Sequence, residues 1–485
     1  MAIAAMILLC LKITGKDIWY DEVFSVEFAS SSLKDIIRLT SNDVHPPLYY
    51  IYLKIVTGIG NAIFGTESFI FFAKLASILP WFGLLYMAAF PVKRHFGECT
   101  GGLFILLATI MPKLCDNYVE IRMYSFALML ITAVFVCALN IALSEKKGSS
   151  LVGLVIFGTA TAYTQYYALV ATVGVYLVLG IYLLIKKDGK HIRSILLCAL
   201  ISAAAFALWV KPLFSQIKNV SDEYWILPLT LRSIPGCLKF LFLPSDGIGA
   251  KGYITAVIVI LFVALIYMYF ILKKPDKEEV FISFAGPGVL VFTVLTGFVL
   301  SMMGRPIFVY RYMIPAIGAF YISVAFVFSK VINTNKWFSI GALSFLVCGY
   351  FTLSAFSYAE DLKIEKMNEA ERVLDSIPDD CIVITNFDQM CTLMSYYLPG
   401  SAVYLYDDRP DSIVELMYNR NDFECHDEDL DKMFAEGQSN VYFFGSFNSR
   451  EDILKDWEEK GIKNEETYDS VMIERYYFNI YRLFK

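Results

Sequence analysis

The sequence predicts a polytopic α-helical membrane protein with a small C-terminal α/β domain. Hydrophobic residues make up 57% of the 485 residues, and charged residues only 18%. Apolar runs of about 18 to 22 residues, the length that spans a bilayer, recur through the first three quarters of the chain. From residue 357 onward, short apolar segments alternate with polar ones, which is typical of buried strands. We therefore expect a membrane domain over residues 1–356 and an α/β domain over residues 357–485.

The first apolar segment, residues 1–14, lacks a small-residue cleavage site and is predicted to be a signal anchor. With about 14 residues it is shorter than the roughly 17 to 25 that a span needs. It is therefore either tilted in a thinned bilayer or continued by a start site upstream. Ten further segments bring the expected number of spans to about eleven; they cover residues 74–92, 99–114, 123–143, 151–168, 169–185, 194–210, 252–272, 280–301, 312–331 and 337–356.

Basic residues indicate which side of the membrane each loop occupies. Most of the loop lysines and arginines fall in five breaks that this span count puts on one face, and the positive-inside rule makes that face cytoplasmic. These breaks are residues 92–98, 144–150, 186–193, 273–279 and 333–336. The opposite face then carries the loops 15–73, 115–123, 211–251 and 304–312 and the C-terminal domain.

Residues 46–64, "PPLYYIYLKIVTGIGNAIF", decide the side on which the first loop lies. If this segment crosses the membrane, the residues before it are cytoplasmic. If it lies flat as an amphipathic hairpin, they are outside. We favour the flat arrangement, because Lys54 and two glycines interrupt the apolar run and the preceding "SSLKDIIRL" resembles an interfacial helix.

The C-terminal domain is expected to combine short buried strands with at least one helix. The strands are predicted in "DDCIVITNF", "SAVYLYDD" and "NVYFFGSF", and the helix in "SREDILKDWEEKG". Ser449 is the expected N-cap of this helix, and the glycine at its end is the expected C-terminal stop.

Composition excludes several kinds of site. The ten cysteines form no CxxC pair and no cluster with histidine, so neither a structural zinc site nor a disulfide framework is indicated. The net charge is −6 and no basic stripe is present, which argues against a nucleic-acid partner.

The first candidate site is the acid pair Asp21 and Glu22 in "WYDEVFS". The aromatic residues around the pair favour a position at the depth of the lipid headgroups. A carboxylate there is partly desolvated, which raises its pKa and makes it a better base. The alternative is a solvated loop with two exposed acids.

Two further external segments hold polar residues that suit a binding site. In "NDVHPPLYY" the two prolines stiffen the chain after His45, although the histidine is equally compatible with a structural helix start. In "YVEIRMYS", Glu120, Arg122 and Tyr124 lie where a loop enters a span, and charges at that depth usually face a cavity or one another. The alternative for the charged pair is snorkelling at the interface.

The remaining candidates lie at the outer ends of later spans. Gln165 and Tyr166 in "YTQYYAL" add polar and aromatic groups but are a weak signal alone. Arg305, Arg311 and Tyr312 occur in "GRPIFVYRYMIP", where arginines on the external face suit a phosphate. Lys211 is a possible helper, although a lysine at the end of a span is more often a snorkelling anchor.

In this order, the segments resemble the GT-C superfamily of polyprenyl-phosphate-sugar-dependent glycosyltransferases. The groups most similar are bacterial relatives of the protein O-mannosyltransferases and of the lipid A aminoarabinose transferases. The resemblance covers about residues 1–356 and is specific over about the first 130. It rests on the Asp-Glu pair followed by "HPPLYY", "IFGTESFIFFAKL", "EIRMYSFAL" and "RYMIP".

The resemblance implies an inverting sugar transfer on the outer face of a bacterial plasma membrane. Asp21 matches the catalytic acid of the family, with Glu22 beside it, and Glu120 matches the acid of the second loop. Lys74 stands where arginine is more usual. Gln165 replaces a histidine common in relatives, so a role that needs a titratable group or a metal ligand is in doubt there.

The implied donor is a polyprenyl-phosphate sugar, and the acceptor is a glycan, a lipid or a protein. Membrane lipids surround the chain, and the sequence itself requires no cofactor. A divalent metal is left open, because no segment has a ligand spacing that demands one. The alternatives are a transporter or flippase of polyprenyl-linked glycans and an inactive membrane scaffold.

Overall fold

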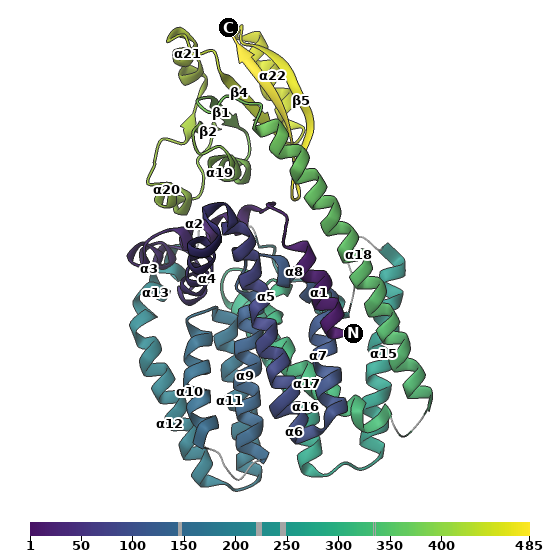
Figure 1. The fold of residues 1–485 in the computed structure, drawn as a ribbon. Helices are drawn as coiled ribbons and strands as arrows, with labels where there is room; N and C mark the ends of the chain where they lie inside the picture. The colour runs from purple at the N-terminus through teal and green to yellow at the C-terminus, as the bar shows by residue number, and fades with distance from the viewer. Residues whose placement is uncertain (144–147, 220–225, 243–248, 333, 335) are drawn as a thin grey trace. The chain divides into compact units, whose positions relative to one another are not determined.

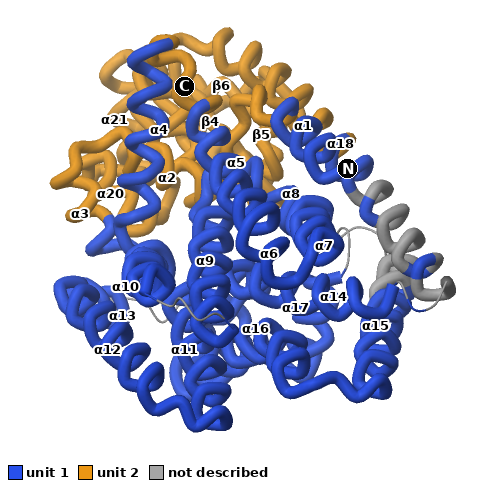
Figure 2. The backbone as a smooth tube through the Cα atoms, turned by 60° about the horizontal axis from the view of Figure 1, so that its bottom comes forward, with its two compact units in different colours: residues 1–11, 40–63, 72–357 blue, residues 12–39, 64–71, 358–485 orange. Residues whose placement is uncertain are grey.

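The computed structural model describes residues 1–143, 148–219, 226–242, 249–332, 334 and 336–485. The chain packs into two compact units (Figure 2). We call residues 1–11, 40–63 and 72–357 the membrane unit, and residues 12–39, 64–71 and 358–485 the sheet unit. The sheet unit thus includes most of the first loop, residues 15–73, as well as the C-terminal segment.

All regular elements among the described residues of the membrane unit are helices, and each of the eleven expected spans coincides with a helix. These helices are α1 (Ala2–Lys12), α5 (Phe69–Met87), α7 (Glu98–Ile110), α9 (Tyr124–Leu143), α10 (Gly148–Ala162), α11 (Tyr166–Ile185), α12 (Gly189–Phe206), α15 (Gly249–Leu272), α16 (Lys277–Met303), α17 (Ile314–Ile332) and α18 (Lys336–Leu374). Shorter helices connect them: α4 (Leu48–Phe64), α6 (Lys93–Phe96), α8 (Pro112–Val119), α13 (Val210–Asn219) and α14 (Ser233–Phe242). The π-helix Ala88–Val92 continues α5 into α6.

The long apolar helices make this a multi-pass membrane protein. Six of the described helices are long and apolar enough to cross a bilayer, or seven if the bent pair Glu98–Ile110 and Lys113–Val119 forms one span. Side chains such as Leu200 (66% exposed) and Ile185 (65% exposed) cover the outside of the bundle. Exposed apolar surface on this scale suits lipid rather than water. The total of about eleven spans stays a prediction.

Helix α17 forms the core of the bundle, and its side chains are almost all buried against α7, α9 and α16. Glycine permits the tightest of these contacts. A Cβ atom on Gly286 of α16 would lie 2.1 Å from the backbone oxygen of Ala319 in α17. Small residues that let helix backbones approach are typical of packing in membranes.

Helices of the membrane unit turn at the predicted basic connections, which gather at one end of the bundle (Figure 1). Ion pairs tie these connections together: Lys186 Nζ lies 3.6 Å from Glu278 Oε2, and Lys330 Nζ lies 2.7 Å from Glu279 Oε1. Residues 144–147, 333 and 335, which belong to two of these connections, lie outside the described residues. The common face expected for these loops agrees with this arrangement.

Residues 46–64, whose position decides the side of the first loop, contain the single continuous helix α4, so the expected hairpin within this segment is wrong. Tyr49, Leu53 and Thr57 form its buried face. Ile55, Ile59 and Ile63 line the other face and are 57%, 58% and 67% exposed. This pattern is amphipathic, as the flat arrangement requires, although a helix of 17 residues also has almost the length of a span.

The sheet unit contains a six-stranded mixed sheet in the order β3-β2-β1-β4-β6-β5. Its strands are β1 (Ile382–Thr385), β2 (Ala402–Tyr406), β3 (Glu424–Cys425), β4 (Val441–Gly445), β5 (Lys463–Ile473) and β6 (Tyr476–Phe484). Strands β1 to β4 run parallel, whereas β6 pairs antiparallel with both β4 and β5. The helices between the strands are α19 (Asp388–Tyr397), α20 (Ser412–Tyr418), α21 (Asp427–Ala435) and α22 (Ser449–Glu459).

Buried aromatic and aliphatic side chains hold this sheet to its helices. Phe443 of β4 and Trp457 of α22 contact each other with ring centroids 5.0 Å apart. Burial of rings of this size contributes most of the hydrophobic stabilisation of a small domain. The first loop adds α2 (Tyr20–Ser30) and the start of α3 (Leu33–Asn42) to the unit, and α19 packs on α2.

The structure differs from the sequence prediction at one cap and at one end of the sheet. The N-cap of α22 is Asn448, and Ser449 is its first helical residue; the Ser449 hydroxyl instead accepts a hydrogen bond from Asn386 Nδ2 at 2.9 Å. The predicted glycine stop is present, because Gly461 follows the helix with φ 85°. The long β5–β6 hairpin is an element that we did not predict.

Candidate active site

Asp21 and Glu22 lie in the first turn of α2, but in different environments. Glu22 is 2% exposed, and its Oε2 accepts the backbone N–H of Trp19 at 3.0 Å. Trp19 is extended (φ −105°, ψ 174°), so this bond fixes the start of the helix. Asp21 is only partly buried. The buried acid is therefore used by its own helix, whereas the other acid is accessible to a ligand.

Acidic residues of the C-terminal segment lie beside Tyr20, at the same helix start. The Tyr20 hydroxyl donates a hydrogen bond to Asp411 Oδ2 at 3.2 Å. Burial, and then the charges of Asp411 and Asp408, raise the pKa of Asp388 to about 7. Burial also raises the pKa of Tyr20, so its hydroxyl stays protonated and remains a donor. The surroundings of α2 thus hold a carboxyl group that titrates near neutral pH.

In the membrane unit, Gln165 begins α11 and is 2% exposed. Neither its Oε1 nor its Nε2 makes a hydrogen bond to any described residue. A buried amide left without partners costs about 1 to 3 kcal/mol. Such a group is suited to binding a polar ligand that supplies the missing partners.

Tyr166, the next residue, is by contrast held on two sides. Its hydroxyl donates to Gln216 Oε1 and accepts the Trp209 Nε1 proton at 3.1 Å. Gln216 Nε2 in turn donates to the backbone oxygen of Thr40 at 2.7 Å. This chain of hydrogen bonds fixes the turn that carries Gln165.

His45 lies close to the same turn. It is 9% exposed, and its Nδ1 lies 3.3 Å from Asp43 Oδ2. Two residues beyond Pro46, the backbone N–H of Leu48 donates to the carbonyl of Tyr163 at 2.9 Å. The first loop and the α10–α11 turn are therefore joined within the membrane unit.

The loop between α8 and α9 holds the second acid and its arginine. The Ser77 hydroxyl of α5 donates to the Glu120 carbonyl at 2.5 Å, and the Arg122 N–H donates to the same oxygen at 2.8 Å. Arg122 is 4% exposed, and Lys74, one turn before Ser77, is 3% exposed. Burial of a cationic side chain at a helix end costs free energy, and residues buried in this way usually have a function.

Arg311 and Tyr312 connect this loop to the α10–α11 turn. Both lie in the 3₁₀ helix Tyr310–Met313 that precedes α17. The Arg311 guanidinium lies 5.8 Å from the ring centroid of Tyr124, and the Tyr312 ring stacks on Tyr167 at 4.5 Å. The structure thus brings together predicted residues from three separate segments at one end of the membrane unit.

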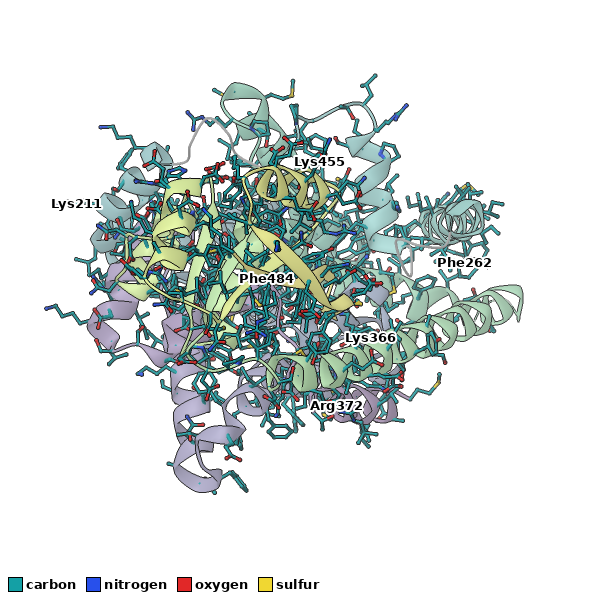
Figure 3. All side chains as sticks on the ribbon, turned by 90° about the horizontal axis from the view of Figure 1, so that it is seen from above. Lys211, Phe262, Lys366, Arg372, Lys455 and Phe484 are labelled. Carbon is teal, nitrogen blue, oxygen red and sulfur yellow. The ribbon has the colours of Figure 1, made fainter. Side chains whose placement is uncertain are left out.

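Two of the predicted residues lie apart from this group. Lys211 is exposed on α13 at the edge of the membrane unit (Figure 3). Arg305 is also exposed, in the segment between α16 and the 3₁₀ helix. Exposure of Lys211 favours the anchor role over a contact with a phosphate.

Sequence reasoning missed several residues that build the site. Asp43 was within the quoted "NDVHPPLYY" motif, and its spacing of two from His45 was an available signal. Trp209 and Gln216 gave no such signal, because neither belongs to a motif and both act through Tyr166. Among the described residues, no group of three His, Cys, Asp or Glu side chains is arranged to hold a metal ion.

Comparison with known proteins identifies the fold. No protein-family model and no curated protein matches the chain in sequence. The chain nevertheless shares its overall fold with a solved structure, in agreement with the fold that the sequence resemblance implied.

Solved structures of ArnT from Cupriavidus metallidurans carry this likeness. The apo structure aligns over 99% of this chain and 96% of its own, with a TM-score of 0.61 and 13% identity. The structure bound to undecaprenyl phosphate gives a TM-score of 0.59 with 12% identity over the same shares of the two chains. The Archaeoglobus fulgidus oligosaccharyltransferase in complex with zinc and sulfate aligns over 92% of this chain and 67% of its own, at 12% identity and a TM-score of 0.47.

Proposed function

We propose that this protein is an inverting glycosyltransferase that moves a sugar from a polyprenyl-phosphate donor to an acceptor at the outer face of the membrane. The shared fold with ArnT supports the class, and one of the two ArnT structures is bound to undecaprenyl phosphate. The acceptor is a glycan, a lipid or a protein with a nucleophilic hydroxyl or amine.

One observation carries the assignment of the base: Asp21 is the accessible acid of its pair. Glu22 is buried and bonded to Trp19, whereas Asp21 is only partly buried on the first turn of α2. A general base must reach the proton that it removes. We therefore assign catalysis to Asp21 and give Glu22 a supporting role in holding the helix start.

Arginines of the membrane unit suit the phosphate of the donor. Arg311 follows the aromatic segment before α17 and lies near the ring of Tyr124. A planar guanidinium binds two phosphate oxygens at once and stabilises the charge that develops on the leaving group. Arg305 adds a second positive charge in the same segment, and Lys211 serves as an interfacial anchor.

The remaining polar residues suit binding of the sugar and the acceptor. Gln165 has a buried amide without partners among the described residues, which matches the hydroxyl groups of a sugar. Tyr166, Tyr312 and Tyr124 provide aromatic walls and hydroxyl groups. Arg122, Glu120 and His45 orient the ligand or the loops around it.

The reaction is a single displacement at the anomeric carbon. Asp21 accepts the proton of the acceptor hydroxyl or amine while the acceptor atom forms its bond to the anomeric carbon. The bond from this carbon to the phosphate oxygen breaks, and the polyprenyl phosphate leaves with both electrons. Attack opposite to the leaving group inverts the configuration.

A transfer assay with purified protein tests this function directly. Undecaprenyl-phosphate sugars with a radiolabelled sugar are supplied together with membrane extracts that contain candidate acceptors. We expect a labelled product with wild-type protein and none with Asp21→Asn at the same monodispersity. Equal transfer by both proteins would refute Asp21 as the base, and absence of transfer with every donor would refute the class.

The side of the membrane on which Asp21 lies requires a separate measurement. A variant without native cysteines that carries Asp21→Cys is treated on whole cells with a membrane-impermeant thiol reagent. Labelling from outside is expected, because a flat α4 puts the first loop outside. Labelling only after permeabilisation would mean that α4 crosses the membrane, and the outer-face mechanism would be wrong.

A further inference from the structure

The four residues immediately before Asp21 are each held by a residue from the last 90 or so positions of the chain, all within the sheet unit. The Ile18 N–H donates to the Tyr397 hydroxyl at 3.0 Å. The Tyr20 hydroxyl donates to Asp411. Asp17 and Trp19 are held by the turn of the β5–β6 hairpin, which comprises Glu474 and Arg475 and is followed by Tyr476.

The hairpin turn makes two consecutive contacts. Glu474 is buried beside Asp17, which is 1% exposed, and burial raises the pKa of Glu474 well above its usual range, so its protonated carboxyl group is able to donate a hydrogen bond to Asp17. The Arg475 guanidinium lies 3.9 Å from the centre of the Trp19 ring. Both residues of the turn thus lie against the segment that precedes Asp21, at residues 17 and 19.

We propose that this turn is a clamp that positions the catalytic base, with Arg475 acting as a positioning residue through Trp19. The inference rests on the function proposed above for Asp21. It also gives the C-terminal segment a role in catalysis itself, in addition to any contact with the acceptor.

The hairpin is suited to this role because it is rigid. Strand β6 pairs with β4 from Val441↔Leu483 to Gly445↔Asn479, and with β5 from Lys463↔Phe484 to Ile473↔Tyr476 with register shifts between Glu466 and Val471. Beyond Gly445 the hairpin continues as two strands, and the pairs from Val471↔Phe478 to Ile473↔Tyr476 hold the residues next to the turn in register. Glu474 has φ 54°, a left-handed conformation that a residue with a side chain adopts only when its surroundings require it.

The contact of Arg475 with Trp19 links this rigid turn to the base. Trp19 is the N-cap of α2, so the orientation of its backbone sets the direction of the first helical turn, where Asp21 lies. A cation over an indole ring is attracted by the ring quadrupole, and arginine also stacks on its face. A lysine in place of Arg475 retains the positive charge but does not stack on the Trp19 ring, whereas a glutamine there has no charge.

Arg475→Gln and Arg475→Lys, with Arg482→Gln as a matched control, test the clamp. Arg482 is an exposed arginine at the other end of the same strand and donates to the Ser439 carbonyl at 3.4 Å. Hydrogen exchange of a peptide that covers residues 13–28 is measured by mass spectrometry in all four proteins. This readout does not depend on knowledge of the donor or the acceptor.

We expect Arg475→Gln to accelerate exchange in this peptide at least several-fold, with no change in peptides from α9 or α17. In the transfer assay, kcat should fall by roughly 10- to 100-fold, the cost of a base displaced by about 1 Å, while the KM for the donor stays constant. Arg475→Lys should recover part of both effects, and Arg482→Gln should behave as wild type.

The outcomes separate the clamp from the proposed function. Unchanged exchange and unchanged kcat in Arg475→Gln, together with inactive Asp21→Asn, would refute the clamp and leave the function intact. If Arg475→Gln exchanges faster but Asp21→Asn does not lower the transfer rate, the proposed function is refuted and the contact of Arg475 with Trp19 stands. If Arg475→Gln fails to fold, the milder Trp19→Phe replaces it, and faster exchange with lower kcat is again required.

Discussion

The segment before Asp21 and the turn that carries Gln165 show opposite ways of treating buried polar groups. In the sheet unit, residues 17 to 20 each have a named partner from the C-terminal segment. In the membrane unit, the Gln165 amide has no hydrogen-bond partner among the described residues. The difference suggests a division of labour: the group that reacts is fixed in advance, whereas a group that binds is left unsatisfied until the ligand arrives.

Two glutamines of the membrane unit show the same contrast between a bonded and an unbonded polar group. Gln165 and Gln216 are 2% and 4% exposed, so both amides are buried in the membrane unit. Gln216 is bonded to Tyr166 and to Thr40 through its two amide atoms. Because burial and chemistry are equal, only the missing partners distinguish a binding glutamine from a structural one.

The largest expected effect is at Asp21, which follows the segment that residues of the C-terminal part of the chain hold in place. Asp21→Asn keeps the size of the side chain but removes the base, and kcat should fall by roughly 100- to 10,000-fold. Asp452→Asn, an exposed acid on α22, is the matched control and should keep full activity. The single-turnover rate with a saturating lipid-linked donor measures the effect. A loss below about tenfold would contradict general-base catalysis by Asp21.

Removal of Arg311, the residue proposed to bind the donor phosphate, should have the next largest effect. Arg311→Ala deletes a charged hydrogen-bond donor worth about 1.5 to 3 kcal/mol, so kcat/KM should fall by roughly 10- to 150-fold. Arg305→Ala should cost less, because its side chain is exposed and solvent screens its charge. Titration of undecaprenyl phosphate as a product inhibitor measures the same interaction without turnover. Equal inhibition of Arg311→Ala and wild type would show that Arg311 does not bind the phosphate.

The two glutamines should respond in opposite directions to substitution by leucine. Gln216→Leu breaks two hydrogen bonds and should lower the free energy of unfolding by about 1 to 3 kcal/mol. Gln165→Leu removes an unsatisfied amide and should raise it by about 1 kcal/mol, while transfer falls by about tenfold. Thermal unfolding in detergent, combined with the transfer assay, measures both quantities. A destabilised Gln165→Leu would mean that the amide is satisfied in the native protein.

The smallest expected effect concerns the pH dependence of the stability of the sheet unit. The pKa of Asp388 is raised by burial from 3.8 to about 7, so the native state holds more protons than the unfolded state between these values. Stability therefore falls as the pH rises through this window and is lowest above it. Asp388→Asn should remove this slope and stabilise the protein at pH 8 by about 1 kcal/mol or less, after allowance for solvent screening. Unfolding temperatures at pH 5.5 and 8 measure the change, and an unaltered slope would contradict it.

The sequence predicts the helices of the membrane unit well because their signal is local. Most of the expected spans contain an apolar run whose length identifies them, whereas residues 1–14 are recognised by their apolar composition although they are shorter than a span needs. The same holds for β1 and β4, whose buried residues are continuous along the chain, and for β2, whose buried residues alternate with half-buried ones. The basic connections are also local and correctly indicate one end of the bundle.

The β5–β6 hairpin escaped prediction for a physical reason. Most residues of β5 are exposed or half-buried, and its segment begins with "KNEETYDS", which lacks an apolar alternation. Such a strand is held by its pairing with β6 and by few contacts of its own side chains. The clamp is harder still to foresee, because Ile18 and Tyr397 are 379 positions apart and neither stands in a motif.

The candidate site shows the same limit. Motifs identify Asp21, His45, Arg122 and Arg311 as polar residues in the right loops, but they do not reveal which acid of the pair is buried. That distinction follows from the extended Trp19 and its bond to Glu22. The missing partners of Gln165 are likewise a property of packing, which no local pattern encodes.

The clamp also has a consequence for the order of events during synthesis of the chain. Residues 17 to 20 leave the ribosome first, whereas Asp411 and the hairpin turn follow roughly 390 to 460 positions later. At translation rates of about 5 to 20 residues per second, the interval is roughly 20 to 90 s. The membrane helices are inserted during this interval while the loop that carries the proposed base still lacks its partners. A ribosome that stalls before the last strands would therefore release a membrane-embedded but inert protein, and competence for transfer would mark a completed chain.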